Sequence, residues 1–385
     1  MHFIGGNKIQ LLRSGAEYFP ALEEAIHNAT HEIYLQSYIY EADATGIRIG
    51  DALKQAAQRK VTVNVLLDGF GSKDLSKQYV QELELAGVRV MFYRPKISPW
   101  TLKRNRLRRL HRKVAVIDNY VGFVGGINII DDENTPQKIP PRVDYAVRIE
   151  GALLPVIEKN VRKLWHRVAL AHLWRANKHE ARHSTKTPSQ HTDYSMKAAF
   201  VIRDNVLHRR DIEDAYLSAI DHAQSEIIIA NAYFVPGRRF RKALIEAAKR
   251  GVNVKLLLQG RMEYFLMFAT HAFYHVFLKN GIEIYEYRKS FMHSKVAVID
   301  NYWSTIGSSN IDPFSLLLAH EANILVQNTA FAHELRADIE ASINSGAHQV
   351  TTQSWAKGNI LQRMASWVAY GLVRFFLGVI GYSKE

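Results

Sequence analysis

The stretch His111-Arg-Lys-Val-Ala-Val-Ile-Asp118 returns almost unchanged as His293-Ser-Lys-Val-Ala-Val-Ile-Asp300. In both copies a histidine and a lysine, two residues apart, precede an apolar β-branched run that ends in an aspartate. Residues at i and i+2 of a strand point to the same face, so each copy predicts a buried strand that presents an imidazole beside an ammonium group. One such pattern is weak evidence, but two copies at equivalent places in a repeat indicate a function.

The repeat extends beyond these motifs and organises the chain. Residues 32–38 align with 226–233, residues 61–69 with 252–260, and residues 87–88 with 281–282. In each half, short β-branched runs alternate with segments whose apolar residues recur at helical spacing. The sequence therefore predicts an α/β protein with two homologous halves.

Composition sets the expected domain boundaries. The polar stretch from Arg175 to Gln190 separates the repeats, so we expect an N-terminal half at 1–175, a linker at 176–195, a C-terminal half at 196–350 and a last segment at 351–385. The N-terminus shows neither the pattern of a signal peptide nor that of a membrane anchor. The apolar run from Trp367 to Tyr382 is shorter than a typical membrane span of about 20 residues.

The overall charge favours anionic partners. The chain of 385 residues is 47% hydrophobic and carries a net charge of +13. That balance suits nucleic acid, acidic lipid or a phosphorylated substrate, without choosing among them. The chain has no cysteine, which excludes disulfides, thiol catalysis and cysteine-bound zinc. The histidines outside the motifs show no spacing typical of metal ligands.

Each motif is followed by a Gly/Ser-rich turn that ends in an asparagine, Asn128 or Asn310, 17 residues after its histidine. A phosphoryl centre under displacement carries negative charge, which Lys113, Lys295 and the two amides can hold. One neutral imidazole can attack phosphorus, while the other protonates the leaving alkoxide and later deprotonates an incoming alcohol. Because the lysines supply positive charge, we expect neither a metal nor another cofactor.

A histidine in this role needs an acceptor at one ring nitrogen, so that the other nitrogen is free. Each half has a carboxylate at the start of the strand after its asparagine turn, and we expect these residues, Asp144 and Glu321, to orient the histidines. Asp118 and Asp300 end their strands before an Asn-Tyr pair. For them two interpretations stay open, a turn cap and direct contact with substrate in the catalytic site.

The first half has a basic insert before its motif. Tyr93 and His111 enclose 17 residues, whereas Tyr287 and His293 enclose 5. The stretch from Arg94 to Lys113, with both ends included, contains nine lysines and arginines and no acid. The expected contacts with anionic headgroups are Trp100, Lys103, Arg104, Arg106, Arg108 and Arg109. Nucleic-acid phosphates or plain solvent are alternatives, but the interleaved Trp and Leu favour a membrane.

Two further apolar segments have alternative interpretations. In residues 360–380, large apolar residues recur every three or four positions, which predicts either an interfacial helix on a membrane or a helix packed on the protein's own core. In residues 261–279 the apolar residues surround the whole helix, which favours burial in the core.

The paired motifs resemble those of the phospholipase D superfamily over nearly the whole chain. The segments at 6–12, 66–72, 229–237 and 307–313 are most similar to bacterial cardiolipin synthases of the B type. The resemblance implies two phospholipase D-like α/β/α halves, related by a pseudo-two-fold axis, around one shared active site. It also implies metal-free transfer of a phosphatidyl group through a phosphohistidine, with His111 as nucleophile and His293 as acid and base.

For the reaction, the resemblance implies that two phosphatidylglycerol molecules give cardiolipin and glycerol. The expected partner is an anionic membrane of phosphatidylglycerol and cardiolipin, and the expected location is peripheral, on the cytoplasmic side of the cell inner membrane. Nucleic acid is not the expected partner. A hydrolase that uses water, a nuclease or phosphodiesterase of the same superfamily, and a non-catalytic membrane scaffold are the alternatives. The sequence leaves open whether phosphatidylethanolamine replaces one donor, and which oligomer forms.

Overall fold

The computed structural model describes residues 2–95, 108–171, 194–261, 269–356, 364, 366–372 and 375. The N-terminal half contains β1 (Ile4–Arg13), α1 (Ser14–His27), β2 (Glu32–Ser37), α2 (Ala44–Gln58), β3 (Thr62–Asp68), α3 (Lys77–Leu85), β4 (Arg89–Tyr93), β5 (Lys113–Ile117), β6 (Val121–Gly125), the 3-10 helix η1 (Pro136–Lys138), β7 (Arg142–Val143), β8 (Tyr145–Gly151) and α5 (Leu154–Ala171).

The C-terminal half repeats this series and adds to it. It contains β9 (Met196–Arg203), α6 (Asp211–His222), β10 (Glu226–Asn231), α7 (Arg238–Lys249), β11 (Asn253–Gln259), α9 (Tyr274–Lys279), β12 (Glu283–Tyr287), β13 (Phe291–Met292), β14 (Lys295–Ile299), β15 (Trp303–Gly307), α10 (Pro313–Leu317), β16 (Glu321–Gln327), α11 (Thr329–Gly346), β17 (Ala347–Val350) and α12 (Thr352–Ala356). The expected linker lies outside the described residues, apart from its last two positions.

One sheet of 15 strands runs through both halves. The N-terminal half follows the order β1-β8-β6-β5-β2-β3-β4, and the C-terminal half repeats it as β9-β16-β15-β14-β10-β11-β12, with β17 added at the end. The two series meet where β1 pairs antiparallel with β9, and the register shifts between Ile4 and Asn7. The predicted α/β architecture of two homologous halves is confirmed, and the pseudo-two-fold axis passes through this seam.

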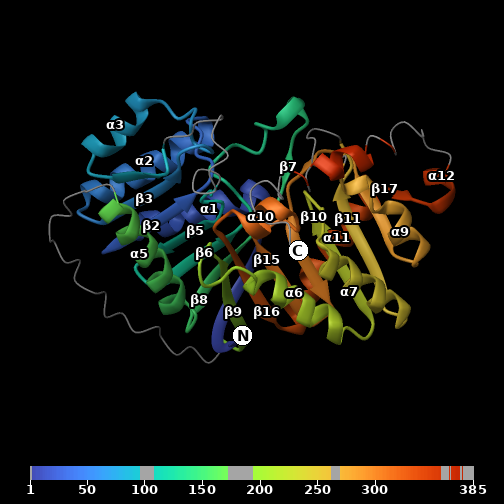
Figure 1. Cartoon of the computed structure of the whole chain (residues 1–385). Coiled ribbons are helices and arrows are strands. Elements are labelled where there is room, and N and C mark those ends of the chain that lie inside the picture. Colours follow the sequence, from blue (N-terminus) through green and yellow to red (C-terminus); the bar gives the residue numbers. More distant parts are fainter. Residues whose placement is uncertain are drawn as a thin grey trace.

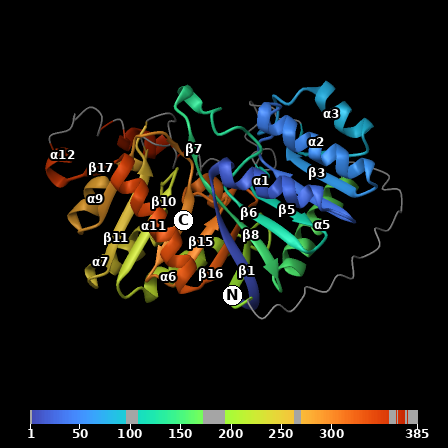
Figure 2. The ribbon, with the colours of Figure 1, turned by 180° about the vertical axis from the view of Figure 1, so that it is seen from behind.

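Helices cover both halves of the sheet, which stand side by side in Figure 1. Helices α1 and α2 bury their apolar faces against the N-terminal strands, and α6, α7 and α9 do so in the C-terminal half. A third core contains residues of both halves together with α5 and α11. Strands β6 and β8 pack against β15 and β16 there, so the two halves share a core as well as a sheet. From behind, α1 and α11 lie in front of the strands (Figure 2).

Loops from each half also reach over the other half. Strand β7 of the N-terminal half pairs in parallel with β13, directly before the second motif. In the opposite direction, the His111 N–H donates to the His320 carbonyl at 3.0 Å, and the His320 N–H donates to the Arg109 carbonyl at 2.7 Å. Each motif histidine is therefore fixed to backbone from the other half.

The motif strands β5 and β14 end in turns with left-handed backbone. Asp118 and Asp300 both have φ of 52°. The Asp118 carboxylate accepts backbone N–H bonds from residues 30–32 at 2.7–2.8 Å, in the turn before β2. Asp300 accepts the equivalent bonds from residues 224–226 at 2.8–3.0 Å, before β10. Burial opposes ionisation of Asp118, but the backbone donors hold its pKa below the ordinary value.

The apolar segment before β12 packs inward, as the sequence predicts for its described part. Phe273, Tyr274 and Phe277 are all buried in the C-terminal core. Tyr264, Phe265 and Phe268 lie outside the described residues. Among the helices of the described part, none has the length and apolar character needed to cross a bilayer.

We expect Asp118→Ala to lower the free energy of unfolding by about 2–3 kcal/mol, because backbone donors in the turn before β2 lose their acceptor. The depressed pKa means that the stabilisation is complete above the ordinary value of 3.8 and is lost as the pH falls through the folded-state pKa. Urea unfolding followed by circular dichroism, at neutral and acidic pH, measures both effects.

Asp51→Ala is the matched control, because this carboxylate is 49% exposed and pairs with Lys54 on the same helix. Its expected effect is within about 0.5 kcal/mol. Equal losses in the two variants would contradict the role of Asp118 in holding this turn.

Candidate active site

The first motif histidine pairs with a carboxylate from the other half. His111 stands two residues before the start of β5, and its Nδ1 atom lies 2.9 Å from Oε1 of Glu321, the first residue of β16. The Glu321 side chain is fully buried, and the His111 side chain is 16% exposed. Ser308 donates its hydroxyl to the second carboxylate oxygen at 2.5 Å. Glu321 is thus held on both oxygens and fixes the plane of the His111 ring.

The second motif histidine has the reciprocal arrangement. His293 Nδ1 lies 2.7 Å from Oδ2 of Asp144, which stands between β7 and β8 of the N-terminal half. The Tyr145 backbone N–H donates to the other oxygen at 2.9 Å. Lys295 Nζ lies 3.4 Å from Oδ2 of the same carboxylate. The imidazole of each half is therefore oriented by an acid of the opposite half.

Burial keeps both imidazoles neutral. Desolvation lowers the pKa of His111 below 6.5, although Glu321 partly opposes it. Desolvation and then Lys295 place the pKa of His293 well below 6.5. A neutral imidazole that donates a hydrogen bond from its Nδ1–H group to a carboxylate carries its free lone pair on Nε2. Both rings thus present a nucleophilic or basic nitrogen away from their carboxylates.

The motif lysines are buried next to these rings. Lys113 donates to the His111 carbonyl at 2.6 Å and lies 5.5 Å from the centre of the Tyr38 ring. Desolvation lowers the pKa of Lys113 to about 7 and that of Lys295 to about 8. Lys295 also lowers the pKa of Lys113, and Glu321 raises that of Lys295. The charges of the two motifs are therefore near enough to act on one another across the halves.

The asparagines are buried in the turns after β6 and β15. Oδ1 of Asn128 accepts the Ile39 N–H at 3.1 Å, which leaves its amide NH2 as a donor. Oδ1 of Asn310 is buried without a hydrogen-bond partner among the described residues. The two asparagines thus occupy equivalent positions in the two halves, but their side-chain amides have different hydrogen-bond partners. The same holds for the two carboxylates.

Two tyrosines contact the histidines, and sequence reasoning gave them no role. The Tyr38 ring centre lies 4.7 Å from that of His111, and the Tyr233 ring lies 6.3 Å from that of His293. Both follow the second strand of their half, so the aligned repeat contained the signal that could have found them. Phe291 stacks on His293 at 5.9 Å and 20°.

The remaining predicted residues lie away from the imidazoles or outside the described part. Asp118 and Asp300 stand at the far ends of β5 and β14, about 20 Å along the strand from the histidines. The Arg109 side chain is 14% exposed and lies 3.6 Å from the Asp68 carboxylate, so its positive charge is compensated by an acid of the protein itself. Arg108 is half-buried. The other expected headgroup contacts, which are Trp100, Lys103, Arg104 and Arg106, lie outside the described residues.

The assembled groups suit displacement at a tetrahedral anionic centre. Two imidazoles provide a nucleophile and a proton carrier, while two ammonium groups provide positive charge in a buried setting where it acts strongly. In the part of the chain that the structure describes, no three His, Asp or Glu side chains gather as a metal site.

Comparison with known proteins gives the family. The family described as "Cardiolipin synthase, PLD-like domain" matches residues 22–138 and 216–343, once in each half. Cardiolipin synthase B of Shigella flexneri is 38% identical over 379 residues, which covers 98% of this chain and 90% of that protein. Cardiolipin synthase 1 of Bacillus cereus is 28% identical over 358 residues, covering 92% of this chain and 70% of that protein.

Solved structures agree on the fold. The crystal structure of phosphatidylserine synthase from Haemophilus influenzae superposes with a TM-score of 0.69 at 15% identity, covering 98% of this chain and 95% of that one. The two family matches fall on the two halves of the sheet, and each contains one motif-bearing strand, β5 or β14. The chain belongs to the phospholipase D-like family of the cardiolipin synthases.

Proposed function

We propose that this protein is a cardiolipin synthase, a phosphatidyltransferase that joins two phosphatidylglycerol molecules and releases glycerol. The observation that carries the proposal is the pair of motif histidines, each held by a buried carboxylate of the opposite half at 2.9 or 2.7 Å. Similarity to cardiolipin synthase B over 98% of the chain supports the same reaction.

In the first step, Nε2 of His111 attacks the phosphorus of one phosphatidylglycerol. The bond between phosphorus and the glycerol oxygen breaks, and His293 gives its proton to that oxygen. The negative charge of the bound phosphodiester favours the protonated form of His293, and Asp144 stabilises it from the other side. The product of this step is a phosphatidyl group on His111 and free glycerol.

In the second step, the terminal hydroxyl of another phosphatidylglycerol takes the place of glycerol. His293 accepts the hydroxyl proton, the oxygen attacks phosphorus, and the bond to His111 breaks. Cardiolipin leaves, and both histidines return to their starting states. The lysines and the amide groups of Asn128 and Asn310 hold the phosphoryl oxygens in both steps, while Glu321 and Asp144 keep the rings aligned.

The acceptor must be a lipid alcohol in preference to water, which requires an entrance at a membrane. We place the membrane contact at the end of the chain, where Met364, Trp367, Val368, Leu372 and Phe375 are exposed. These residues follow a spacing of three or four, while Ala369 is buried and Tyr370 packs on Phe273. The helix thus anchors one side in the protein and offers an apolar side to lipid.

This arrangement supports a peripheral protein on an anionic membrane of phosphatidylglycerol and cardiolipin. With a net charge of +13, the chain is attracted to the anionic inner leaflet, and the cytoplasmic side of the inner membrane is the location we propose. In this scheme residues 351–385 form the membrane-interacting segment, and the basic insert, including Arg108, guards the site entrance.

The reaction is tested by mass spectrometry of lipids after incubation with phosphatidylglycerol vesicles and a chelator. We expect cardiolipin and glycerol, with losses on the order of a thousandfold or more in His111→Ala and in His293→Ala. His222→Ala, at an exposed histidine at the end of α6, should retain activity. In His293→Ala the phosphatidyl adduct on His111 should itself form slowly, because the first step lacks the acid that protonates the leaving glycerol oxygen.

Other products would identify the alternatives. Phosphatidic acid as the sole product would mean that water is the acceptor and the protein is a hydrolase. Cleavage of DNA without any turnover of lipid would replace the proposal with a nuclease.

The dependence on pH follows from the lysines and histidines. With monomeric short-chain phosphatidylglycerol, kcat/KM should fall as the pH rises through 7 and 8, because Lys113 and Lys295 lose their charge in the free enzyme. On the acid side it should persist below pH 6.5, because the pKa of the nucleophile His111 is lowered and protonation of His293 supplies the proton that the first step uses. Lys113→Arg should flatten the alkaline fall, because arginine keeps its charge. A value of kcat/KM that rises with pH through 7 and 8 would contradict this assignment.

The membrane contact is tested with the double variant Val368→Ser and Leu372→Ser. Loss of two exposed apolar side chains should weaken binding to phosphatidylglycerol vesicles by about tenfold or more in a cosedimentation assay. Leu85→Ser is the control, because Leu85 is 89% exposed on α3. Turnover of monomeric short-chain substrate should be unchanged in both proteins. Equal vesicle binding by the two proteins would move the membrane contact elsewhere.

A further inference from the structure

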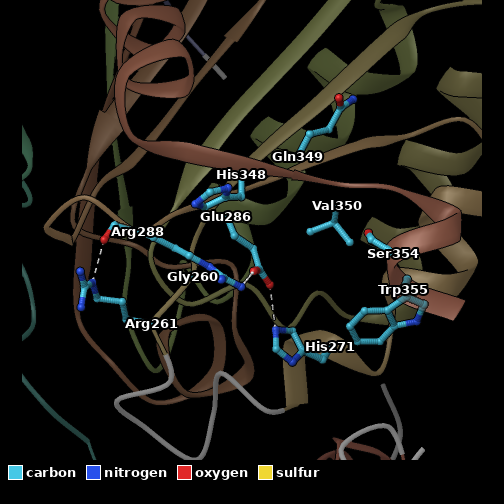
Figure 3. Close-up of a pocket in the computed structure, with 10 residues that line it drawn as sticks. All are labelled: Gly260, Arg261, His271, Glu286, Arg288, His348, Gln349, Val350, Ser354 and Trp355. Carbon is cyan, nitrogen blue, oxygen red and sulfur yellow. Dashed lines mark hydrogen bonds and ion pairs between the residues drawn. The ribbon is translucent and has the colours of Figure 1, made fainter. Parts of the chain in front are cut away.

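A second pocket lies in the C-terminal half, outside the motif residues. It has a volume of about 670 Å³ and is lined by Gly260, Arg261, His271, Glu286, Arg288, His348, Gln349, Val350, Ser354 and Trp355. Figure 3 shows His348 of β17 beside Glu286 of β12, with Arg288 just after that strand, Val350 farther along β17, and His271 and Trp355 below them. The volume falls within the range typical of small-molecule sites.

The pocket is built partly from β17 and α12, which have no counterpart in the N-terminal half. Strand β4 ends the sheet in the N-terminal half, whereas β17 continues it beyond β12 in the C-terminal half. Helix α12 follows β17 directly and brings Trp355 to the pocket. The duplication that builds the active site therefore does not account for this cavity.

The polar lining carries an excess of cationic groups. Glu286 is its carboxylate, and it is already satisfied by His271 at 3.1 Å, Tyr274 at 3.2 Å and Arg288 at 2.5 Å. Arg261 donates through Nε to the Arg288 carbonyl at 2.8 Å. Within the described part of the chain, Arg261 forms no ion pair. Among the described residues this guanidinium has no carboxylate partner, and a guanidinium in a pocket wall suits an anionic ligand.

The buried rim contributes one more unsatisfied group. His271 is 8% exposed, and its Nδ1 atom is buried without a hydrogen-bond partner among the described residues. His348 adds a second imidazole at the open side. Because Nε2 donates to Glu286, Nδ1 of the neutral ring is an acceptor, so the partner it lacks is a hydrogen-bond donor of a ligand and not the phosphate itself.

A small hollow adjoins the pocket on the side of the proposed membrane helix. His271 and Trp355 also line a neighbouring hollow of about 90 Å³, whose wall includes Val276 and Trp367. Trp367 belongs to the terminal helix, which exposes Val368 (61%) and Phe375 (71%). A polar pocket that leads to an exposed apolar surface has the two chemistries of a phospholipid, a charged head and an apolar body.

The pocket opens on the same edge of the sheet as the active site. Arg261 follows the carboxyl end of β11 and Arg288 that of β12, the edge at which Asn231 ends β10 beside Lys295. Arg288 stands five residues before His293 in the chain. A lipid bound in the pocket would therefore come from the same side of the molecule as a lipid that reaches the motif histidines.

We propose that this pocket binds the phosphate ester of an anionic phospholipid, as a site distinct from the catalytic one. The phosphate accepts hydrogen bonds from Arg261 and Arg288, and the glycerol backbone lies against Trp355. The acyl chains leave past Trp367 to the bilayer. This site holds the protein on anionic membranes. It takes no part in the transfer reaction, although both sites take their lipids from the same membrane.

The test compares wild type with Arg261→Gln and with the double variant Arg261→Gln, Arg288→Gln. Binding is measured by cosedimentation with vesicles of phosphatidylglycerol and phosphatidylcholine in equal parts, and with phosphatidylcholine alone. Lys249→Gln is the control, because this 58% exposed cation lies at the opposite edge, just before β11 begins. Inorganic phosphate is titrated separately, with tryptophan fluorescence as the readout and Trp355→Phe to assign the signal.

We expect the double variant to weaken binding to the anionic vesicles by about tenfold or more, with Lys249→Gln near wild type. Arg261→Gln alone should give part of this loss, and it leaves the buried Glu286 with its donors in place. Turnover of monomeric short-chain phosphatidylglycerol should be retained, which separates this site from catalysis.

Other outcomes identify the source of the phosphate or overturn the site. A fluorescence change at Trp355 with inorganic phosphate, without any change in vesicle binding, would retain the anion chemistry and replace the lipid with a soluble phosphate. Wild-type vesicle binding by the double variant, with no response to phosphate, would overturn the proposal. Failure of wild type to turn over short-chain lipid would sink the proposed function, while the vesicle measurements would still report on the pocket.

Discussion

The exchange of carboxylates between the halves is the interaction on which the rest of the structure depends. His111 is oriented by Glu321 and His293 by Asp144, and both acids are buried. A buried carboxylate without its partners is costly, so neither half is complete until the other is in place. The β7–β13 ladder and the backbone hydrogen bond between His111 and His320 also join the two halves, next to the motif histidines. Assembly of the molecule and assembly of the site are therefore one event.

The two halves have similar backbones, but the side chains around their motif histidines differ. Gly126 occupies the place of Ser308, and a Cβ atom there would lie 2.3 Å from an oxygen of Asp144. Ser308 instead donates its hydroxyl to Glu321. Both motif lysines donate to the carbonyl of their own histidine, but Lys295 also lies near Asp144, whereas Lys113 lies over the Tyr38 ring. The two imidazoles each pair with a carboxylate, but the charged and polar groups around them differ. This difference suits a division of roles between a nucleophile and a proton carrier.

Much of this arrangement could be predicted from the sequence, because the repeat marks it twice. The motif strands, the two-half fold and the carboxylates at Asp144 and Glu321 all follow from aligned positions. The alignment could not tell that each acid serves the histidine of the other half, because that depends on loops that cross between the halves. It gave no signal for the pocket at Arg288, because β17 and α12 have no copy in the N-terminal half. Tyr38 and Tyr233 were visible as a pair, but an aromatic residue after a strand is too common to indicate a site.

The seam between β1 and β9 has a mechanical consequence. Hydrogen bonds of one continuous sheet cross it, and a shared apolar core lies beside it. The halves therefore cannot swing apart about a hinge, as the lobes of many two-domain enzymes do. Substrates that arrive one after another must enter and leave while the catalytic groups stay fixed. Any gating then falls to the loops around the motif histidines, because the sheet and the shared core hold the two halves in one arrangement.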